Sequence, residues 1–425
     1  MTFRMSAQVN DIVEHLFRQE SGKLVSSLAR AFGLSRLDAV EDVVQDALLA
    51  ALNNWSFRGI PENPTAWLHR VAKNKAVDLI RKRNRESRET AEMLPGMRAA
   101  LLSLGIEQNF LSWEIEDSQL RMMFACCHPG IPLESQIALT LKTLCGFSVR
   151  EIASAFLTKE PAIEKRLGRA RKYFRDHHVE LEAPTGDILH RRMSAVLSCL
   201  YLLFNEGYKR TDSDGLVQYD LCLEALRLAL IVTEHPQISS SEAFALVALM
   251  TLIAARFETR TNEHGDIVLL PEQDRSRWNA ELIERGLNYL ARSEPDMYSS
   301  SYHLEAAIQS LHTTARSFEE TDWPAILGLY KRLYAIKPSP IVAMHMSVSM
   351  GEVHGAEASI AFLSGLPLSE YYLYHALLGD AYLKAGRQSE AALSFKRALE
   401  LTMNSREKAL LTERLACVAG AVPGT

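Results

Sequence analysis

Apolar residues recur at three- and four-residue spacing along almost the whole chain, a period typical of α-helices that bury one face. The pattern is strongest at 65–88, where the buried stripe would hold Leu68, Val71, Ala72, Ala76, Leu79 and Ile80. Helices are also expected at 9–32, as a pair or one long helix, and at 38–52, 133–145, 148–156 and 162–177. Further helices, without strands, follow at 190–205, 220–233, 241–260, 274–292 and 302–318. The sequence therefore predicts an all-α protein.

Two interruptions of this pattern divide the chain. Polar residues and Pro95-Gly96 break it at 87–114, which predicts a linker. An acidic stretch at 176–187, interrupted by Pro184, predicts a domain boundary. The expected parts are domains at 1–88 and 116–178 with a linker at 89–115, a helical extension at 179–320 and repeats at 321–425.

The last part fits a repeat pattern. Residues 372–405 match a tetratricopeptide repeat, with Leu378, Gly379, Tyr382, Gly386, Ala391, Phe395 and Ala398 at repeat positions. Upstream, Ile326, Tyr330, Leu333 and Pro338 match the second helix of a preceding repeat, and Gly355 with Ile360 suggests a degenerate one between. One clean repeat is not stable alone, so we expect the upstream helices to be cryptic repeats or a cap.

Composition and charge narrow the class of protein. The 425 residues are 47% hydrophobic, enough for two or three domains with substantial cores. The net charge is only −5, so any basic surface is local and suits a specific partner. Residues 1–10 lack the apolar core of a signal peptide, and the longest apolar run, 243–255, is too short to span a bilayer. We therefore expect a cytoplasmic protein without membrane contact.

Catalytic and metal-binding patterns do not stand out. The six cysteines lack the paired spacing of a zinc site or of a disulfide framework. Cys126-Cys127-His128 is the one cluster with the chemistry of metal ligands, but adjacent cysteines on a helix point in different directions and cannot easily close on one ion. We find no Ser-His-Asp order and no glycine-rich phosphate loop. We therefore expect no cofactor, no metal and no enzymatic activity.

The charge on 65–88 is one-sided. Eight basic residues stand against Asp78 and Glu86: Arg70, Lys73, Lys75, Arg81, Lys82, Arg83, Arg85 and Arg88. Such a run neutralises phosphates and binds nucleic acid in a salt-dependent way. The alternative is a basic helix face that is simply solvated.

A second basic helix follows a short turn. Ser148 is placed to cap the helix 148–156, Pro161 suits a first helical turn, and 162–177 carries six basic residues around Ile163, Leu167, Ala170 and Phe174. Helix, short turn and basic helix is the order of a helix-turn-helix that enters a major groove. The alternative is a helix-turn-helix used for protein contacts.

These segments together resemble a known family. EDVVQDALLAAL at 41–52, the aromatic segment at 55–59, Asn63-Pro64 and VAKNKAVDLIRKRNR at 71–85 resemble region 2 of extracytoplasmic-function (ECF) sigma factors, promoter-recognition subunits of bacterial RNA polymerase. The segment 133–177 resembles region 4 of the same family. It departs from the family pattern at Leu157, Ala162 and Glu164, so the recognised promoter sequence cannot be read from this segment.

The resemblance implies a role for each matching residue. Asp42, Gln45 and Asp46 would dock on core RNA polymerase. Trp55, Phe57 and Arg58, in an exposed loop, would meet the melted minus-10 strand, because aromatic and arginine side chains stack on unpaired bases. Lys73, Asn74, Arg81 and Arg85 would also contact minus-10 DNA. Minus-35 DNA would be contacted by Arg150, Lys165, Arg166, Arg169 and Arg171.

Several strings resemble a subgroup of this family with a C-terminal helical extension: FACCHPGIP (124–132), FNEGY (204–208), QDRSRW (273–278), TDWP (321–324) and PSP (338–340). FNEGY and QDRSRW would form either a ligand or peptide site or a buried ion pair that joins helices, and we favour the second interpretation.

The expected function is that of a sigma factor that binds core RNA polymerase and promoter DNA. Its C-terminal array would regulate it through intramolecular or peptide contacts and would replace a separate anti-sigma protein. The alternative is a helix-turn-helix regulator, or a repeat scaffold, that is not a polymerase subunit.

Overall fold

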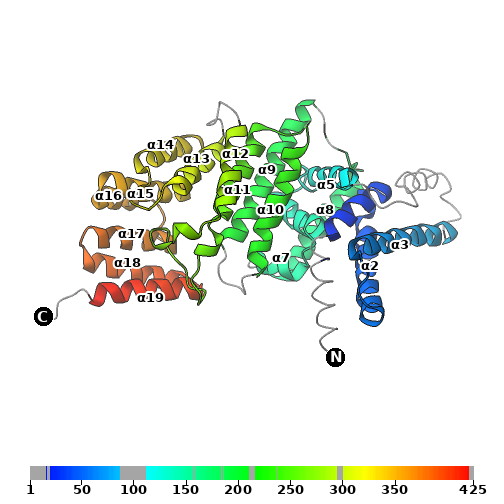
Figure 1. Ribbon diagram of the computed structural model, residues 1–425, viewed down its shortest axis with the longest axis horizontal. Helices are drawn as coiled ribbons and strands as arrows, with labels where there is room; N and C mark the ends of the chain where they lie inside the picture. The colour runs from blue at the N-terminus through cyan, green and yellow to red at the C-terminus, as the bar shows by residue number, and fades with distance from the viewer. Residues whose placement is uncertain are drawn as a thin grey trace. The chain divides into compact units, whose positions relative to one another are not determined.

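The structure is a computed structural model (Figure 1) that describes residues 16, 20–86, 112–156, 158–182, 184, 186–209, 216–236, 238–293 and 300–420. Throughout these residues the regular elements are helices, and one isolated β-bridge joins Thr261 and Ile267. The all-α prediction is confirmed. The chain forms two compact units, Met1–Glu206 and Gly207–Thr425. Most of the predicted linker, 87–111, lies outside the described residues.

The first unit holds both basic helices. Its elements are a helix over 20–32, η1 (Leu34–Arg36), α2 (Leu37–Arg58), α3 (Pro64–Glu86), α5 (Ser112–Cys126), α6 (Leu133–Leu144), α7 (Val149–Ala155), α8 (Glu160–Asp176) and most of α9 (Gly186–Lys209). The α9 helix packs on this unit: Arg192 donates to the carbonyl oxygen of Phe124, and Cys199 Sγ lies 3.7 Å from Thr140 Oγ1. The core of the first unit therefore includes residues beyond the predicted boundary at 178.

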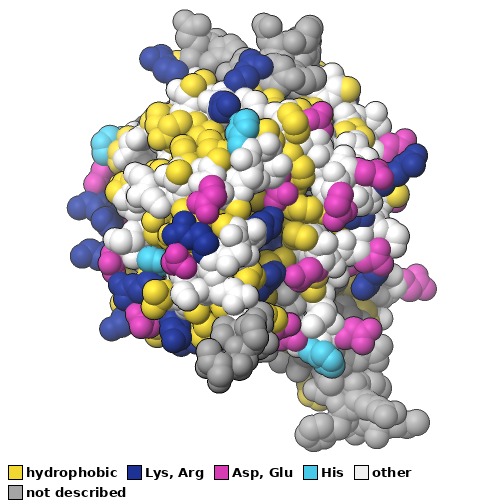
Figure 2. Space-filling model, turned by 90° about the vertical axis from the view of Figure 1, so that its left-hand side faces the viewer, with side chains coloured by type: hydrophobic (Ala, Val, Ile, Leu, Met, Phe, Trp, Pro, Cys, Tyr) yellow, Lys and Arg dark blue, Asp and Glu magenta, His cyan; other side chains and the backbone are white. Residues whose placement is uncertain are grey.

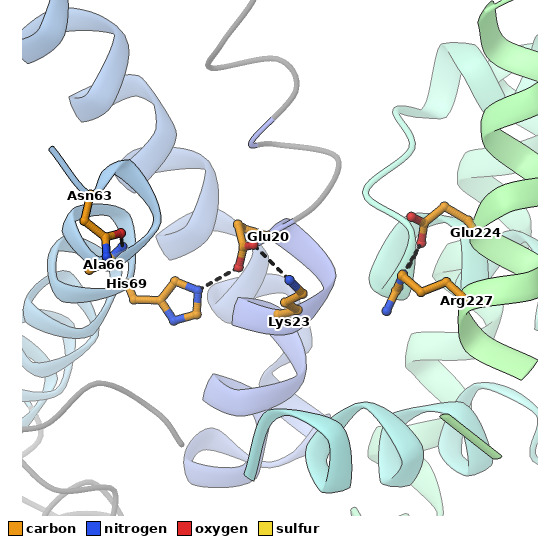
Figure 3. A network of polar contacts seen from close by, with 7 residues as sticks. All are labelled: Glu20, Lys23, Asn63, Ala66, His69, Glu224 and Arg227. Carbon is orange, nitrogen blue, oxygen red and sulfur yellow. Dashed lines mark hydrogen bonds and ion pairs between the residues drawn. The ribbon is translucent and has the colours of Figure 1, made fainter. Parts of the chain in front are cut away.

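The basic helix α3 is fixed at its start and along one face. Asn63 caps it by accepting from the backbone N–H of Ala66 at 2.9 Å, and Pro64 is its first residue. Every fourth residue from Leu68 to Ile80 is buried, as the period predicted. His69 Nε2 donates to Glu20 Oε2 at 2.9 Å, and Lys23 Nζ donates to Glu20 Oε1 at 2.9 Å (Figure 3). Glu20 thus joins α3 to the 20–32 helix.

The helix-turn-helix has the predicted caps. Ser148 Oγ accepts from the N–H of Glu151 at 3.1 Å, and Glu151 Oε2 accepts from the N–H of Ser148 at 2.7 Å, which is a capping box at the start of α7. Gly146, just after α6, has φ of 70°, a value that favours glycine. Pro161 lies in the first turn of α8. These local signals fix the start of α8, whose buried face holds Ile163, Leu167, Ala170 and Phe174.

The second unit is a succession of helices. They are α10 (Leu216–Glu234), α11 (Ser241–Ala254), α12 (Ala280–Arg292), α13 (Ser301–Thr314), α14 (Trp323–Ile336), α15 (Pro340–His354), α16 (Ala356–Ser364), α17 (Tyr372–Lys384), α18 (Gln388–Leu401) and α19 (Ser405–Gly420). From α13 onward each helix packs against the next, over three successive apolar clusters centred on Ile326, Met344 and Phe395. A Cβ at Gly379 would lie 2.6 Å from the ring of Phe395, so α17 and α18 approach closely where the repeat pattern expects a glycine.

Two predicted helices are shorter than expected. The helix predicted at 241–260 ends at Ala254, and the one predicted at 274–292 begins at Ala280. Between them lie η2 (Phe257–Thr259), η3 (Leu270–Glu272), η4 (Arg275–Arg277) and irregular chain. The helix α12 starts late because Asn279 caps it, accepting from the N–H of Leu282 at 3.0 Å, while the N–H of Asn279 donates to Ala255 O at 2.9 Å.

Close packing at Gly22 generates a stability prediction. A Cβ at this position would lie 1.9 Å from the carbonyl oxygen of Leu144 on α6, whereas one at Gly168 in α8 would meet nothing within 4 Å. Gly22→Ala should therefore destabilise the first unit by about 2 kcal/mol, as overpacking does. Gly168→Ala should stabilise it by about 0.5–1 kcal/mol, because alanine favours helix. Denaturant unfolding of the two variants checks the opposite signs, and equal effects would contradict the packing described.

The Glu20 hydrogen bonds generate a pH prediction. Burial opposes ionisation of Glu20, but the hydrogen bonds from His69 and Lys23 outweigh it and hold the pKa of Glu20 below its ordinary value of 4.5. A carboxylate with a lowered pKa contributes stability above pH 4.5 and loses it as the pH falls through the folded-state pKa. Glu20→Gln should cost about 1–2 kcal/mol at neutral pH. Thermal unfolding should show the deficit shrinking below pH 4.5, and a deficit that does not depend on pH would refute the assignment.

Candidate nucleic-acid interface

The outer face of α2 carries an exposed polar strip. Asp42, Gln45 and Asp46 are exposed, while Val43, Val44 and Ala47 between and beside them are buried. Positions i, i+3 and i+4 share one helix face, so the three side chains point the same way. Asp46 lies 3.9 Å from Lys75 of α3. A partner protein can therefore reach this strip. That the partner is core RNA polymerase remains a prediction.

The loop predicted at 55–59 is helical, and that prediction is wrong. The α2 helix continues through Arg58 and ends at Gly59, whose φ is 80°. Trp55 is 1% exposed and packs edge-on against Trp67, with ring centroids 5.3 Å apart. Trp55 continues the buried stripe of Leu48 and Ala51, and that spacing in the sequence is the signal that could have placed it in the core. We therefore withdraw Trp55 as a DNA contact.

Phe57 and Arg58 lie at the surface, whereas Trp55 is buried. Phe57 is 90% exposed, and Arg58 beside it is exposed in the last turn of the same helix. An exposed phenylalanine next to a cation offers a face on which an unpaired base can stack. These two residues remain candidates.

The predicted DNA contacts on α3 differ in exposure. Asn74 and Arg81 are exposed, and Arg81 lies 3.6 Å from Asp78 on its own helix. Lys73 is half-buried. Arg85 belongs to α3, but its side chain lies outside the described part of the chain. The exposed residues lie opposite the buried stripe that begins at Leu68.

Three of the predicted minus-35 contacts are exposed. Lys165 and Arg169 lie on the outer face of α8, and Arg150 lies on α7. Arg150, Lys159, Glu160 and Glu164 line an open groove of about 600 Å³ at the turn between the two helices. Leu157 in this turn lies outside the described residues. The groove carries charges of both signs.

The other two predicted minus-35 contacts are held by carboxylates. Arg166 Nη2 lies 2.7 Å from Glu134 Oε2 at the start of α6. Arg171 Nε lies 2.9 Å from Asp38 Oδ1, and Arg171 Nη2 donates to Glu41 Oε2 at 2.5 Å. Sequence reasoning missed Asp38, Glu41 and Glu134. No local pattern marks them, because each pairs with an arginine far away along the chain.

The cysteines of FACCHPGIP are buried. Cys126 is fully buried, and burial raises the pKa of its thiol well above the ordinary range. Such a thiol is a packing residue of low reactivity. Within the described residues, no group of three or more His, Cys, Asp or Glu side chains is arranged to hold a metal ion.

Residues of QDRSRW, and Tyr208 of FNEGY, make contacts within the second unit. Arg275 donates to the carbonyl oxygens of His312 and Ala315, both at 2.8 Å, and its guanidinium lies over the Trp278 ring at 4.9 Å. Trp278 Nε1 donates to Thr259 Oγ1 at 3.0 Å. Arg260, in turn, covers the Tyr208 ring at 3.8 Å and donates to the Tyr208 carbonyl oxygen at 2.8 Å. The arginines satisfy backbone carbonyls at helix ends, and the printed partners of Arg275 and Arg260 are carbonyls, a hydroxyl and aromatic rings rather than the expected ion pair.

The α14–α19 array also exposes apolar surface. Figure 2 shows apolar side chains among charged ones on this face. A groove of about 460 Å³ is lined by Pro340, Ile341, Pro367, Leu368 and Tyr371. Among the described residues, no helix is both long and apolar enough to cross a bilayer.

Comparison with protein families gives three matches in order. Residues 17–86 match sigma-70 region 2, and residues 121–173 match sigma-70 region 4. Residues 192–294 match a family of unknown function, DUF6596. The first two matches cover α3 and the helix-turn-helix, where the exposed basic residues lie.

Individual relatives extend the comparison. The chain is 36% identical over 405 residues to an uncharacterized protein of Rhizobium meliloti (strain 1021), covering 92% of this chain and 94% of that protein. It is 27% identical over 170 residues to the RNA polymerase sigma factor NccH of Alcaligenes xylosoxydans xylosoxydans, covering 40% of this chain and 88% of NccH. It is 31% identical over 159 residues to the RNA polymerase sigma factor CnrH of Cupriavidus metallidurans, covering 35% of this chain and 78% of CnrH. The chain therefore belongs to the same family as the Rhizobium protein, and its regions 2 and 4 make it an ECF-like sigma factor.

Proposed function

We propose that this sigma factor docks on core RNA polymerase through Asp42, Gln45 and Asp46 and recognises promoters with two separated elements. The observation that carries the proposal is the order of regions 2 and 4, each with exposed basic residues on one helix of the first unit. The mechanism is binding, because promoter recognition needs positioned charges and stacking faces rather than a reaction centre.

Minus-10 recognition would use the end of α2 together with α3. Phe57 would stack on an unpaired base, and Arg58, Asn74 and Arg81 would contact its strand. Base stacking on an aromatic side chain stabilises a single strand by about 1–3 kcal/mol, comparable to the cost of unpairing a base. Exposure of Phe57, at 90%, supports this assignment.

Minus-35 recognition would use the helix-turn-helix. In helix-turn-helix proteins the second helix enters the major groove, and on this proposal Lys165 and Arg169 of α8 would contact bases and phosphates. Arg150 lies on the preceding helix, where phosphate contacts are expected. Arg166 and Arg171 would join once their carboxylate partners release them.

The C-terminal array would regulate the sigma regions and take the place of a separate anti-sigma protein. The second unit has its own apolar clusters, so it would bind a partner as an independently packed domain. Its predicted tetratricopeptide character is part of this proposal, supported by the close approach of Gly379 and Phe395. The input would be a peptide or a segment of the chain itself.

Polymerase docking is tested on the α2 strip. Asp42→Ala combined with Gln45→Ala should lower run-off transcription with purified core polymerase at least tenfold, because it removes contacts made in the complex without touching the buried face of α2. Asn53→Ala, another exposed polar residue of α2, is the matched control and should leave transcription unchanged. Full activity of the double variant would contradict sigma docking and favour a helix-turn-helix regulator.

Regulation is tested by removing the second unit. The chain should be cut after Glu206, because a cut near Thr185 would remove α9 residues that pack on the first unit. We expect promoter activity of the shortened protein to change at least fivefold relative to the full chain, up if the array masks the sigma regions and down if it assists polymerase binding. Circular dichroism must show a folded product. Unchanged activity under every condition tested would refute a regulatory array.

A further inference from the structure

Three arginines of the second unit lie close together in the irregular chain between α11 and α12. Arg256 lies just after α11, Arg260 follows η2, and Arg275 begins η4. The guanidinium carbons of Arg256 and Arg275 lie 5.6 and 4.9 Å from the ring centroid of Trp278. Burial alone would raise the pKa of Tyr208, but Arg260 and Arg256 beside it hold that pKa below its ordinary value. The three arginines are therefore neighbours, and we call them the arginine cluster.

The positive charge of the arginine cluster is not balanced by carboxylates. The hydrogen-bond acceptors of the three side chains are the amide oxygen of Gln309, three backbone carbonyls and one hydroxyl, all of them neutral. Over the part of the chain that the structure describes, no carboxylate forms an ion pair with any of the three. Glu319, whose charge acts on Arg275, is exposed and lies beyond ion-pair distance. The cluster thus holds three positive charges without a paired negative one.

Burial makes this arrangement unfavourable. Arg256 is 7% exposed, and its Nε has no hydrogen-bond partner among the described residues. His312 is also 7% exposed, with Nδ1 unpartnered in the same sense. Burial and the charges of Arg256 and Arg275 lower the pKa of His312 to about 3, so its ring is neutral near pH 7. Like charges removed from water are costly unless an opposite charge balances them. A bound anion would supply that charge.

The exposure of the cluster and the chemistry of guanidinium define the anion. Arg260 and Arg275 are half-buried and border the solvent, whereas Arg256 lies deeper. The planar fork of a guanidinium group matches two oxygens of a phosphate or carboxylate group. Attraction grows with the charge of the ligand, so three arginines favour a phosphate group, with nearly two negative charges, over a single carboxylate.

We propose that the arginine cluster binds a small phosphate-bearing anion, with Arg260 and Arg275 at the entrance and Arg256 beneath them. Arg260 contacts Tyr208 in the last turn of α9, and Arg256 contacts Gln309 on α13. An anion shared by the two arginines joins these helices and stabilises the second unit. The inference does not depend on the sigma function, because binding is measured without polymerase.

The titration arm compares two substitutions within one segment of the chain. The full chain is titrated calorimetrically with sodium pyrophosphate, inorganic phosphate or citrate at constant ionic strength. We expect saturable binding of pyrophosphate, weaker binding of citrate, and a rise in the unfolding temperature with pyrophosphate. Arg260→Gln should lower the pyrophosphate affinity at least about tenfold, since it removes a charge-assisted contact. Arg277→Gln removes the same charge from an exposed neighbour outside the cluster and should leave the affinity unchanged.

The footprinting arm uses the unsubstituted chain, so it decides the matter even if Arg260→Gln does not fold. Phenylglyoxal modifies arginine side chains, and mass spectrometry gives the rate at each position. Pyrophosphate at about ten times its dissociation constant should slow modification of Arg260 and Arg275 about tenfold, because the occupied fraction is protected. Arg277 and Arg169, the latter on the outer face of α8, should react at unchanged rates.

The outcomes decide the arginine cluster separately from the sigma function. Protection confined to Arg260 and Arg275 supports the proposal, whether or not the chain starts transcription. The proposal is overturned if neither pyrophosphate nor phosphate binds saturably, or if Arg260→Gln and Arg277→Gln lose affinity equally. Protection of Arg169 in place of the cluster would overturn it as well, because the anion would then bind the helix proposed to contact DNA. Citrate binding as tight as that of pyrophosphate would refute the assignment to phosphate.

Discussion

A guanidinium can pair with protein carboxylates or with a DNA phosphate, but its donors cannot serve both at once. In the first unit of this protein, carboxylates of α2 hold two arginines of α8. Arg171 lies on the helix whose basic side chains are expected to reach DNA, yet it is paired with Asp38 and Glu41 on α2. Burial raises the pKa of Glu41 even with Arg171 beside it, so for this carboxylate the cost of desolvation outweighs the attraction to the arginine. Because desolvation and charge attraction oppose each other here, the ion pairs can form in the free protein and still break when another anion binds Arg171.

The two units use arginine for different purposes. In the first unit, the described arginines of α3 and α8 are exposed or half-buried, and Arg166 and Arg171 pair with carboxylates. In the second unit, Arg275 and Arg260 donate to backbone carbonyls and cover aromatic rings, which fixes the irregular chain between α11 and α12. Arginine-rich strings of similar composition therefore have a structural role in the second unit, whereas those of the first unit are the proposed DNA contacts.

Local periodicity was enough to predict most of the fold. The buried stripe of α3, the capping box at Ser148 and Pro161 in α8 follow from residues close together in sequence. Trp55 was misplaced because an aromatic-rich segment ending in glycine suggested a loop, although the stripe of Leu48 and Ala51 continues into it. The pairing of Arg171 with Glu41 was not predictable from the sequence, because periodicity carries no information about partners 130 residues apart. The sequence thus indicates which residues belong to the candidate site, but it does not indicate which of them contact one another.

In vitro transcription over a pooled promoter library, with the RNA 5′ ends sequenced, tests the central claim most directly. Purified core polymerase and the full chain, beside the form cut after Glu206, should give discrete start sites preceded by two shared elements at a constant spacing. If only the shortened form gives starts, the sigma regions are active and the array inhibits them. Absence of discrete starts from both forms, with a reference sigma factor active in the same assay, would contradict the account.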